Sequence, residues 1–307
     1  MTDSKTTVDW LRFRTQGTPG EVLEAIRPLM GQLGPQMALG SYGKGLFGFR
    51  HSLPLMLGQN VPMGRLDFGG ESQRDWIRVD MPGKACQWVQ DWDAVEAIEA
   101  LPAAEIRRLD IAMTTWRGEM THDQVVKAYE AGKFTTRGRP PNLRTITNSD
   151  PRAGRTCYVG NREADKFMRC YEKGYELAAK VPGMLVTHID GFKVEDIYRC
   201  ELELKAEGTP IPWETIERRD QYFAGSYPFC AELLPGVEAD ILQRRPEKAP
   251  QRELQAALAN CRAQFGNTLF TALVAYQGDI GAVWDKVVGR EHSKHLLAAG
   301  VLLVDHD

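Results

Sequence analysis

The chain lacks the segments by which proteins enter or cross membranes. No run of about 18 apolar residues occurs, which is the length that a membrane-spanning helix needs. The first five residues are polar and lack the apolar core of a signal peptide. We therefore expect a cytoplasmic protein without a membrane partner.

Paired cysteines are also absent. The six cysteines are scattered and none belongs to a C-x-x-C pair; they are Cys86, Cys157, Cys170, Cys200, Cys230 and Cys261. This spacing argues against a structural zinc site and against a disulfide framework. We expect buried free thiols.

A large charge excess is missing too, because the formal net charge is only −3. Residues 133–173 are an exception, with ten basic and four acidic residues. Such a stretch can contact phosphate groups. The residues expected to bind DNA in this way are Arg139, Arg144, Arg155, Arg162 and Lys166. A solvated surface loop is the competing interpretation, since charge runs commonly lie in such loops.

What the chain does have is a hydrophobic content of 43%, enough to build one large domain or two moderate ones. Strands and helices are mixed up to Pro212. The expected strands are residues 8–14, 64–68, 76–81, 106–115, 156–160 and 197–205, and the expected helices are residues 20–33, 88–101 and 121–131. Residues 132–153 are rich in Gly, Pro, Arg and Asn and are expected to form a loop.

After Pro212 the sequence predicts only helices, at residues 252–265, 268–276 and 280–288. The fold class predicted is α+β, a mostly antiparallel sheet with flanking helices followed by a helical C-terminal region. We place the boundary between a first domain of strands and helices, residues 1–212, and the helical region, residues 213–307.

Two expected strands carry acidic residues on one face. Because side chains alternate along a strand, Asp110 points away from its apolar neighbours Leu109 and Ile111. Glu201 and Glu203 likewise share a face of their strand. A carboxylate in the middle of a strand is costly to bury unless it is paired or bound to a cation. These residues are candidate metal ligands, and a solvent-facing ladder of charges is the competing interpretation.

Tyr171 is flanked by Arg169 and Lys173. A positive potential around a phenol lowers its pKa and holds a phosphate close, as attack on a phosphodiester requires. A core tyrosine beside two surface cations is the competing interpretation.

Together these residues would supply a phosphodiester-transfer site, which needs a nucleophile, a divalent ion and cations that balance the developing charge. Tyr171 would be the nucleophile, and hard carboxylate oxygens would hold Mg²⁺ or Mn²⁺. The candidate metal ligands are Asp110, Glu201, Glu203 and Asp9, and the candidate cations are Arg169, Lys173 and Arg162.

The same segments, in the same order, resemble the Rep_trans-type replication initiation factors. These are rolling-circle initiators of plasmids and filamentous phages, with related relaxases of conjugative elements. The run G-R-T-C-Y-V-G-N-R-E-A-D-K-F-M-R-C-Y-E-K at residues 154–173 is similar to the family signature. Before it come Asp9-Trp10 and R-L-D-I-A at residues 108–112, and after it R-x-E-x-E-x-K at residues 199–205. A further run, residues 222–229, resembles the phage branch.

The resemblance, which covers residues 8–230, implies a metal-dependent endonuclease that nicks one strand at an origin. It implies that Tyr171 forms a covalent 5′-phosphotyrosine. It also implies a fold similar to the HUH-type nucleases, with acidic ligands in place of paired histidines, since the chain has no H-x-H. The partner would be origin DNA with a single-stranded or hairpin nick site, in the cytoplasm of a bacterial host. A host helicase and a second copy of the chain are further partners that the resemblance allows.

Two positions leave alternatives open. Thr114 stands where the family often has a second aspartate. Metal binding would then be weaker, or depend on Glu203 or Asp9, or the chain would be a DNA-binding regulator that does not cleave. Tyr175 lies four residues after Tyr171 and would share its face on a helix. It would then be a second nucleophile or a tyrosine that only packs. The sequence does not separate a replication initiator from a conjugative relaxase.

Overall fold

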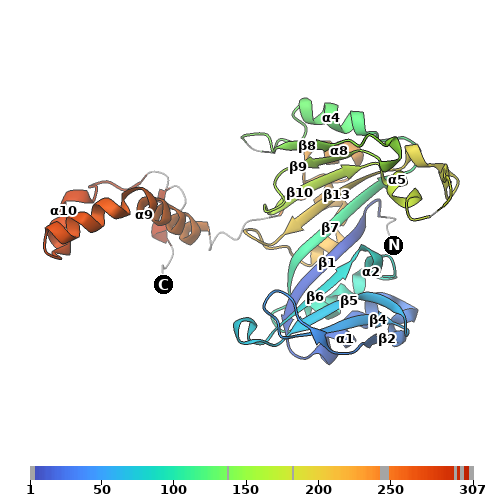
Figure 1. The fold of residues 1–307 in the computed structure, drawn as a ribbon, viewed down its shortest axis with the longest axis horizontal. Helices are drawn as coiled ribbons and strands as arrows, with labels where there is room; N and C mark the ends of the chain where they lie inside the picture. Colours follow the sequence, from blue (N-terminus) through green and yellow to red (C-terminus); the bar gives the residue numbers. More distant parts are fainter. Residues whose placement is uncertain are drawn as a thin grey trace. The chain divides into compact units, whose positions relative to one another are not determined.

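The computed structural model describes residues 4–136, 138–181, 183–242, 249–293, 296–297 and 301–303. The chain forms two compact units, residues 1–243 and residues 244–307. An eleven-stranded antiparallel sheet makes up the frame of the first unit, and helices make up the second (Figure 1).

The sheet confirms the predicted fold class. Its strands are β1 (Thr7–Gln16), β2 (Met37–Leu39), β3 (Gly43–Lys44), β4 (His51–Leu57), β5 (Val61–Phe68), β6 (Trp76–Pro82), β7 (Glu105–Thr115), β8 (Leu143–Ile146), β9 (Thr156–Val159), β10 (Lys166–Tyr171) and β13 (Tyr198–Lys205). Ten of them lie side by side in the order β2-β4-β5-β6-β1-β7-β13-β10-β9-β8, and β3 pairs with β4. The short strands β11 (His188–Ile189) and β12 (Phe192–Lys193) form a separate hairpin.

The sheet consists of two halves that follow the same path, and β1 and β7 pair with each other at its centre. In the first half, β1 leads through helix α1 (Pro19–Ile26) to strands whose order outward from β1 is β6, β5, β4 and β2. In the second half, β7 leads through helix α4 (His122–Glu130) to strands whose order outward from β7 is β13, β10, β9 and β8. An approximate twofold axis between β1 and β7 therefore relates the halves.

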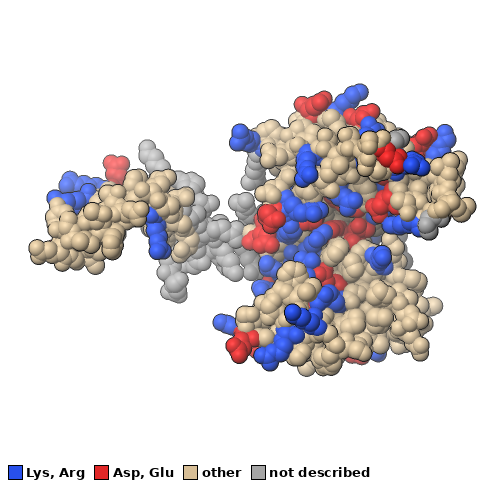
Figure 2. All heavy atoms as spheres, in the orientation of Figure 1, with Lys and Arg blue, Asp and Glu red and all other residues tan. Residues whose placement is uncertain are grey.

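One face of the sheet is apolar and carries the core. Leu11, Phe13 and Leu109 are fully buried there. They pack with apolar side chains of α1, α4 and two later helices, α7 (Arg219–Ala224) and α8 (Pro228–Leu233). The other face is polar, and Figure 2 shows basic and acidic side chains gathered over the middle of the first unit. Strand alternation places Asp110, Tyr171, Glu201 and Glu203 on this polar face.

The first unit extends to residue 243, beyond the boundary that we expected at residue 212. Trp213 packs edge-on against Phe13, with ring centroids 5.7 Å apart. Phe229 lies 4.8 Å from Phe134. The helices between residues 213 and 243 are short and bury aromatic side chains in the core of the sheet, so they belong to the first unit.

The expected strands are present, whereas several helices are shorter than expected. The helix expected at residues 20–33 is replaced after Ile26 by a 3₁₀ segment, Arg27–Gln36, where Gly31 has a φ of 50°. Within residues 88–101 only a 3₁₀ turn, Asp93–Val95, and α3 (Glu96–Glu99) form. The expected loop at residues 132–153 contains β8. The other short helices are α2 (Gly83–Cys86), α5 (Lys173–Ala178) and α6 (Glu214–Glu217).

The second unit contains α9 (Ala249–Ala275) and α10 (Ile280–Val287), so a helical C-terminal region is confirmed. The helices expected at residues 252–265 and 268–276 are one continuous helix. Cys261 on α9 is exposed, contrary to our expectation, while the other five cysteines are buried free thiols. Among the residues described, none of the helices has both the length and the apolar character that crossing a membrane requires.

Candidate active site

Three adjacent strands bring the predicted site residues onto the polar face. In the register of β10 and β13, Tyr171 lies opposite Arg199, and Arg169 lies opposite Glu201. Glu201 in turn lies opposite Ala112 of β7. Because neighbouring strands are only about 4.8 Å apart, the Tyr171 side chain can reach Glu201 diagonally.

The Tyr171 hydroxyl sits between a carboxylate and an ammonium group. Its Oη donates a hydrogen bond to Oε1 of Glu201 at 2.5 Å. Lys173 Nζ donates to the same Oη at 3.2 Å. The Arg169 guanidinium lies 4.0 Å from the centroid of the tyrosine ring, and Tyr171 as a whole is only 4% exposed. The structure thus brings Tyr171 together with both of the cations that flank it in the sequence.

The pKa of Tyr171 is raised, although we expected its neighbouring cations to lower it. Burial is the main cause, and the charge of Glu201 and its hydrogen bond with Tyr171 add to the rise, while Arg199 only partly opposes it. Burial also raises the pKa of Glu201. A carboxylate with a raised pKa is a stronger proton acceptor. The site therefore pairs a neutral phenol with a carboxylate base.

Lys173 is held in place by an acidic residue of the same helix. Its Nζ donates to Oε1 and Oε2 of Glu176 at 3.0 and 3.1 Å. Burial opposes ionisation of Glu176, but hydrogen bonds from Lys180 and Lys173 outweigh it and lower the pKa of this carboxyl to about 2. The ionised Glu176 therefore keeps the ammonium of Lys173 beside the Tyr171 hydroxyl.

Two of the four predicted metal ligands, Asp110 and Glu203, share one arginine. Arg108 contacts Asp110 at 2.6 Å and Glu203 at 2.9 Å, and Lys205 contacts Glu203 at 2.9 Å. Burial raises the pKa of Asp110 to about 7, against the effect of Arg108, and the nearby Glu203 adds to the rise. The carboxylates are thus crowded and compete for the same cation.

The other two predicted ligands, Asp9 and Glu201, share Arg199. Its Nη1 lies 2.9 Å from Asp9 and 4.0 Å from Glu201. Its Nε donates to Oγ1 of Thr114 at 2.8 Å. Thr114, at the position where a second aspartate was expected, therefore orients Arg199. Sequence reasoning missed this linking role of Arg199, for which the alternation of Arg199 and Glu201 on one strand face was the available signal.

The carboxylates of these two pairs are hard oxygen donors of the kind that Mg²⁺ and Mn²⁺ prefer. They do not converge on one point, because an arginine bridges each pair. In the part of the chain that the structure describes, no group of three or more His, Cys, Asp and Glu residues could hold a metal ion. Metal binding therefore stays a prediction. Of the two carboxylate pairs, Asp9 and Glu201 form the one beside Tyr171.

The cations predicted to bind DNA have different surroundings. Arg139, Arg144 and Arg162 are exposed. Arg155 contacts Glu172 at 2.9 Å and is only partly exposed. The exposed three are therefore accessible to solvent, and their contact with DNA stays a prediction.

Lys166 is directed away from the polar face. Side chains alternate along β10, so Lys166 lies on the opposite face from Arg169. Its Nζ donates to the carbonyl oxygen of Ser226 at 2.5 Å and lies 3.9 Å from the centroid of the Tyr227 ring. Burial lowers its pKa to about 8. Contrary to the prediction, Lys166 is not positioned to contact DNA on the polar face.

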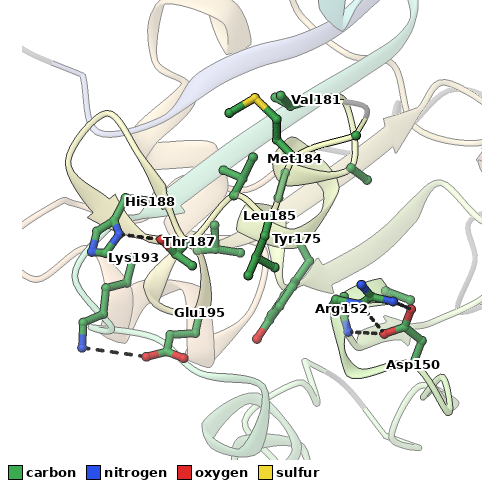
Figure 3. A pocket seen from close by; sticks show the side chains of 16 residues that line it. Asp150, Arg152, Tyr175, Val181, Met184, Leu185, Thr187, His188, Lys193 and Glu195 are labelled. Carbon is green, nitrogen blue, oxygen red and sulfur yellow. Dashed lines mark hydrogen bonds and ion pairs between the residues drawn. The ribbon is translucent and has the colours of Figure 1, made fainter.

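Tyr175 does not share a helix face with Tyr171, because Tyr171 ends β10 and Tyr175 lies on α5. Tyr175 lines a cavity of about 950 Å³ whose lining does not include Tyr171. Figure 3 shows Tyr175 among the lining side chains, together with Leu185 and the ion pair of Arg152 and Asp150.

Residues 104–254 match the family described as replication initiation factor, so the resemblance seen in the sequence is confirmed over this part. A solved structure of a rolling circle replication initiator protein from Geobacillus stearothermophilus is similar, with 22% identity and a TM-score of 0.47. The alignment covers 66% of this chain and 74% of that chain. No curated protein matches the sequence.

Proposed function

We propose that the protein cuts one strand of DNA at a replication origin and remains joined to the new 5′ end through Tyr171. The match of residues 104–254 to replication initiation factors supports this setting. The observation that carries the chemistry is the 2.5 Å hydrogen bond from Tyr171 Oη to Glu201. It places a proton acceptor on the nucleophile, as covalent catalysis by a hydroxyl group requires.

In the proposed step, Tyr171 Oη attacks phosphorus, and the bond from phosphorus to the 3′ oxygen breaks. Glu201 takes the proton of the phenol, and the leaving oxygen takes a proton to become a 3′ hydroxyl. The 5′ phosphate is then esterified to Tyr171. Attack of a 3′ hydroxyl on this ester rejoins the strand. The hydroxyl then loses its proton, and Glu201 returns a proton to the phenol oxygen of Tyr171.

Positive charge around Tyr171 would stabilise the transition state, in which negative charge grows on the phosphoryl oxygens. Arg169 packs on the tyrosine ring and Lys173 contacts its hydroxyl. Both cations therefore lie where a phosphate would bind to be attacked by Oη.

A divalent cation also belongs to this proposal. Mg²⁺ or Mn²⁺ would polarise a phosphoryl oxygen. Asp9 and Glu201, the pair that shares Arg199, are the residues that would hold it. Asp110 and Glu203, the pair that shares Arg108, are the other candidate ligands. Glu201 would then serve both as a ligand and as the proton acceptor, through its two oxygens.

The test is to replace Tyr171 by phenylalanine. Tyr171→Phe is expected to abolish the covalent protein–DNA adduct while DNA binding stays within about twofold, because only the attacking oxygen is lost. The adduct is measured on a denaturing gel with a supercoiled plasmid that carries the origin of the encoding element, in Mg²⁺ or Mn²⁺.

Tyr175→Phe is the matched control, since it removes a hydroxyl four residues away in the sequence and is expected to leave the adduct intact. If Tyr171→Phe still nicks at the normal rate, Tyr171 is not the nucleophile. Specific binding without nicking by the unaltered protein in either metal would instead identify a DNA-binding regulator.

A further inference from the structure

The half of the sheet without Tyr171 carries a counterpart of the site just described. In both halves a row of three residues crosses the innermost three strands on the polar face. These rows are Ala112–Glu201–Arg169 and Arg12–Asp80–Arg65. Under the approximate twofold axis, Asp80 takes the place of Glu201, and Arg65 takes the place of Arg169.

The next row along the strands repeats the correspondence and ends in a difference. These rows are Thr114–Arg199–Tyr171 and Arg14–Arg78–Asp67. Arg78 takes the place of Arg199, whereas Asp67 takes the place of Tyr171. The first half thus has two arginines and a carboxylate at equivalent places but no tyrosine, and it has Arg12 and Arg14 where the second half has Ala112 and Thr114.

The carboxylates of this counterpart are already neutralised by arginines. Asp67 is fully buried and forms ion pairs with Arg65 and, at 2.7 Å, with Arg78. Asp80 pairs with Arg78 and, at 3.1 Å, with Arg12. Three arginines therefore surround two carboxylates. The side chains of Arg12 and Arg65 are 27% and 31% exposed, so positive charge faces the solvent.

An aromatic side chain stands beside these arginines. The Phe47 ring lies 4.4 Å from the Arg78 guanidinium, yet Phe47 is 69% exposed. Its backbone is in the left-handed region, with a φ of 55°, which is strained for a bulky residue. Strain of this kind persists where the surrounding structure enforces it and is common at binding sites. The fold therefore holds an exposed ring next to a cationic patch.

We infer that Arg12, Arg65 and Phe47 form a second binding site, which takes single-stranded DNA and performs no chemistry on it. Exposed aromatic rings beside cations are the features by which proteins bind single strands, through base stacking and phosphate contacts. That the bound strand is the one cut at Tyr171 rests on the proposed function. Only β1 and β7 separate β6 from β13, so the two sites lie roughly 15–25 Å apart on one face.

The experiment measures binding with the Tyr171→Phe protein, so that it does not depend on cleavage. Fluorescence anisotropy with a labelled oligothymidylate of about 16 nucleotides, near the upper site size of a single-strand binding fold, reports the affinity. Phe47→Ala is expected to weaken binding about tenfold, through loss of one stacked base. Arg65→Gln is expected to lower the slope of log affinity against log salt by about one phosphate contact.

Met184→Ala is the matched control, because Met184 is also an exposed apolar residue, 73% exposed, but lies outside the counterpart site. Circular dichroism spectra identify any variant that does not fold. If folded Phe47→Ala and Arg65→Gln bind the oligothymidylate as the parent does, the second site does not exist. An equal loss of affinity for a DNA duplex of the same length would overturn the assignment to single strands. Failure of Tyr171 as the nucleophile would leave these binding results unchanged.

Discussion

The two halves of the sheet have the same path but treat their carboxylates differently. In the first half, Asp67 and Asp80 are each bound directly by arginines, the contact from Arg78 to Asp67 being 2.7 Å. In the second half, the arginines stand further from Glu201, at 3.5 Å for Arg169 and 4.0 Å for Arg199. The nearest partner of Glu201 is the Tyr171 hydroxyl at 2.5 Å.

The difference lies in the nearest partner of each carboxylate, which is a phenol for Glu201 and an arginine for Asp80. Glu201 is buried with weaker cation contacts, so its pKa is raised and it remains basic. Under the proposed function, Tyr171 would make the second half reactive, and the first half, with Asp67 at the equivalent place, would only bind DNA.

The largest expected effect is on cleavage and distinguishes Glu201 from its counterpart Asp80. Glu201→Gln keeps the size and hydrogen bonding of the side chain but cannot take the phenol proton. We expect the nicking rate to fall by a factor of about 10²–10⁴, the usual contribution of a general base. Nicking of supercoiled origin plasmid under single-turnover conditions measures it.

Asp80→Asn is the paired control and is expected to leave the rate of the chemical step unchanged. The pH profile provides a second readout. Because only the ionised Glu201 accepts a proton, the rate of the unaltered protein should fall as the pH drops through the raised pKa of Glu201. The nicking rate of Glu201→Gln should not show this fall at low pH. If the fall persists in Glu201→Gln, another residue is the base.

A smaller effect concerns stability and depends on Asp110, whose folded-state pKa is about 7 instead of its ordinary 3.8. Between these values the folded protein binds more protons than the unfolded chain, so stability falls as the pH rises. Relative to Asp110→Asn, the free energy of unfolding should fall by up to about 4 kcal/mol between pH 4 and pH 7, at about 1.4 kcal/mol per unit of pKa shift.

Urea unfolding at several pH values, with a chelator to exclude divalent metal, measures this difference. If the free energy of unfolding of the unaltered protein differs from that of Asp110→Asn by the same amount at every pH, Asp110 is ionised in the folded protein throughout this range.

The smallest expected effect tests whether the halves are built alike. Thr18 caps the N-terminus of α1 and Thr121 that of α4, and each threonine side chain accepts a hydrogen bond of 3.3 Å from the backbone N–H three residues on. Thr18→Ala and Thr121→Ala should each lower the free energy of unfolding by about 1 kcal/mol, the usual cost of losing such a cap. Chemical denaturation measures both, and a large inequality would argue against equivalent roles for the two helices.

The sequence by itself determined six of the eleven strands of the sheet, among them β7 and β13, and the faces of their side chains. Alternation predicted that Asp110, Glu201 and Glu203 point away from the core, because side-chain direction along a strand is a local property. The order of motifs around Tyr171 indicated a replication initiation factor, and residues 104–254 match that family. The helical C-terminal region also followed from local periodicity.

Only the tertiary structure decided what depends on register and burial. The raised pKa of Tyr171 follows from its burial against Glu201, a residue 30 positions away in the sequence. Lys166 points toward the apolar face, and the first unit extends beyond Trp213. Both depend on which helices cover that face. The counterpart of the site around Asp67 became visible only when the strand order was known. Pairing between distant strands and removal of water are collective, so no single segment of the chain encodes them.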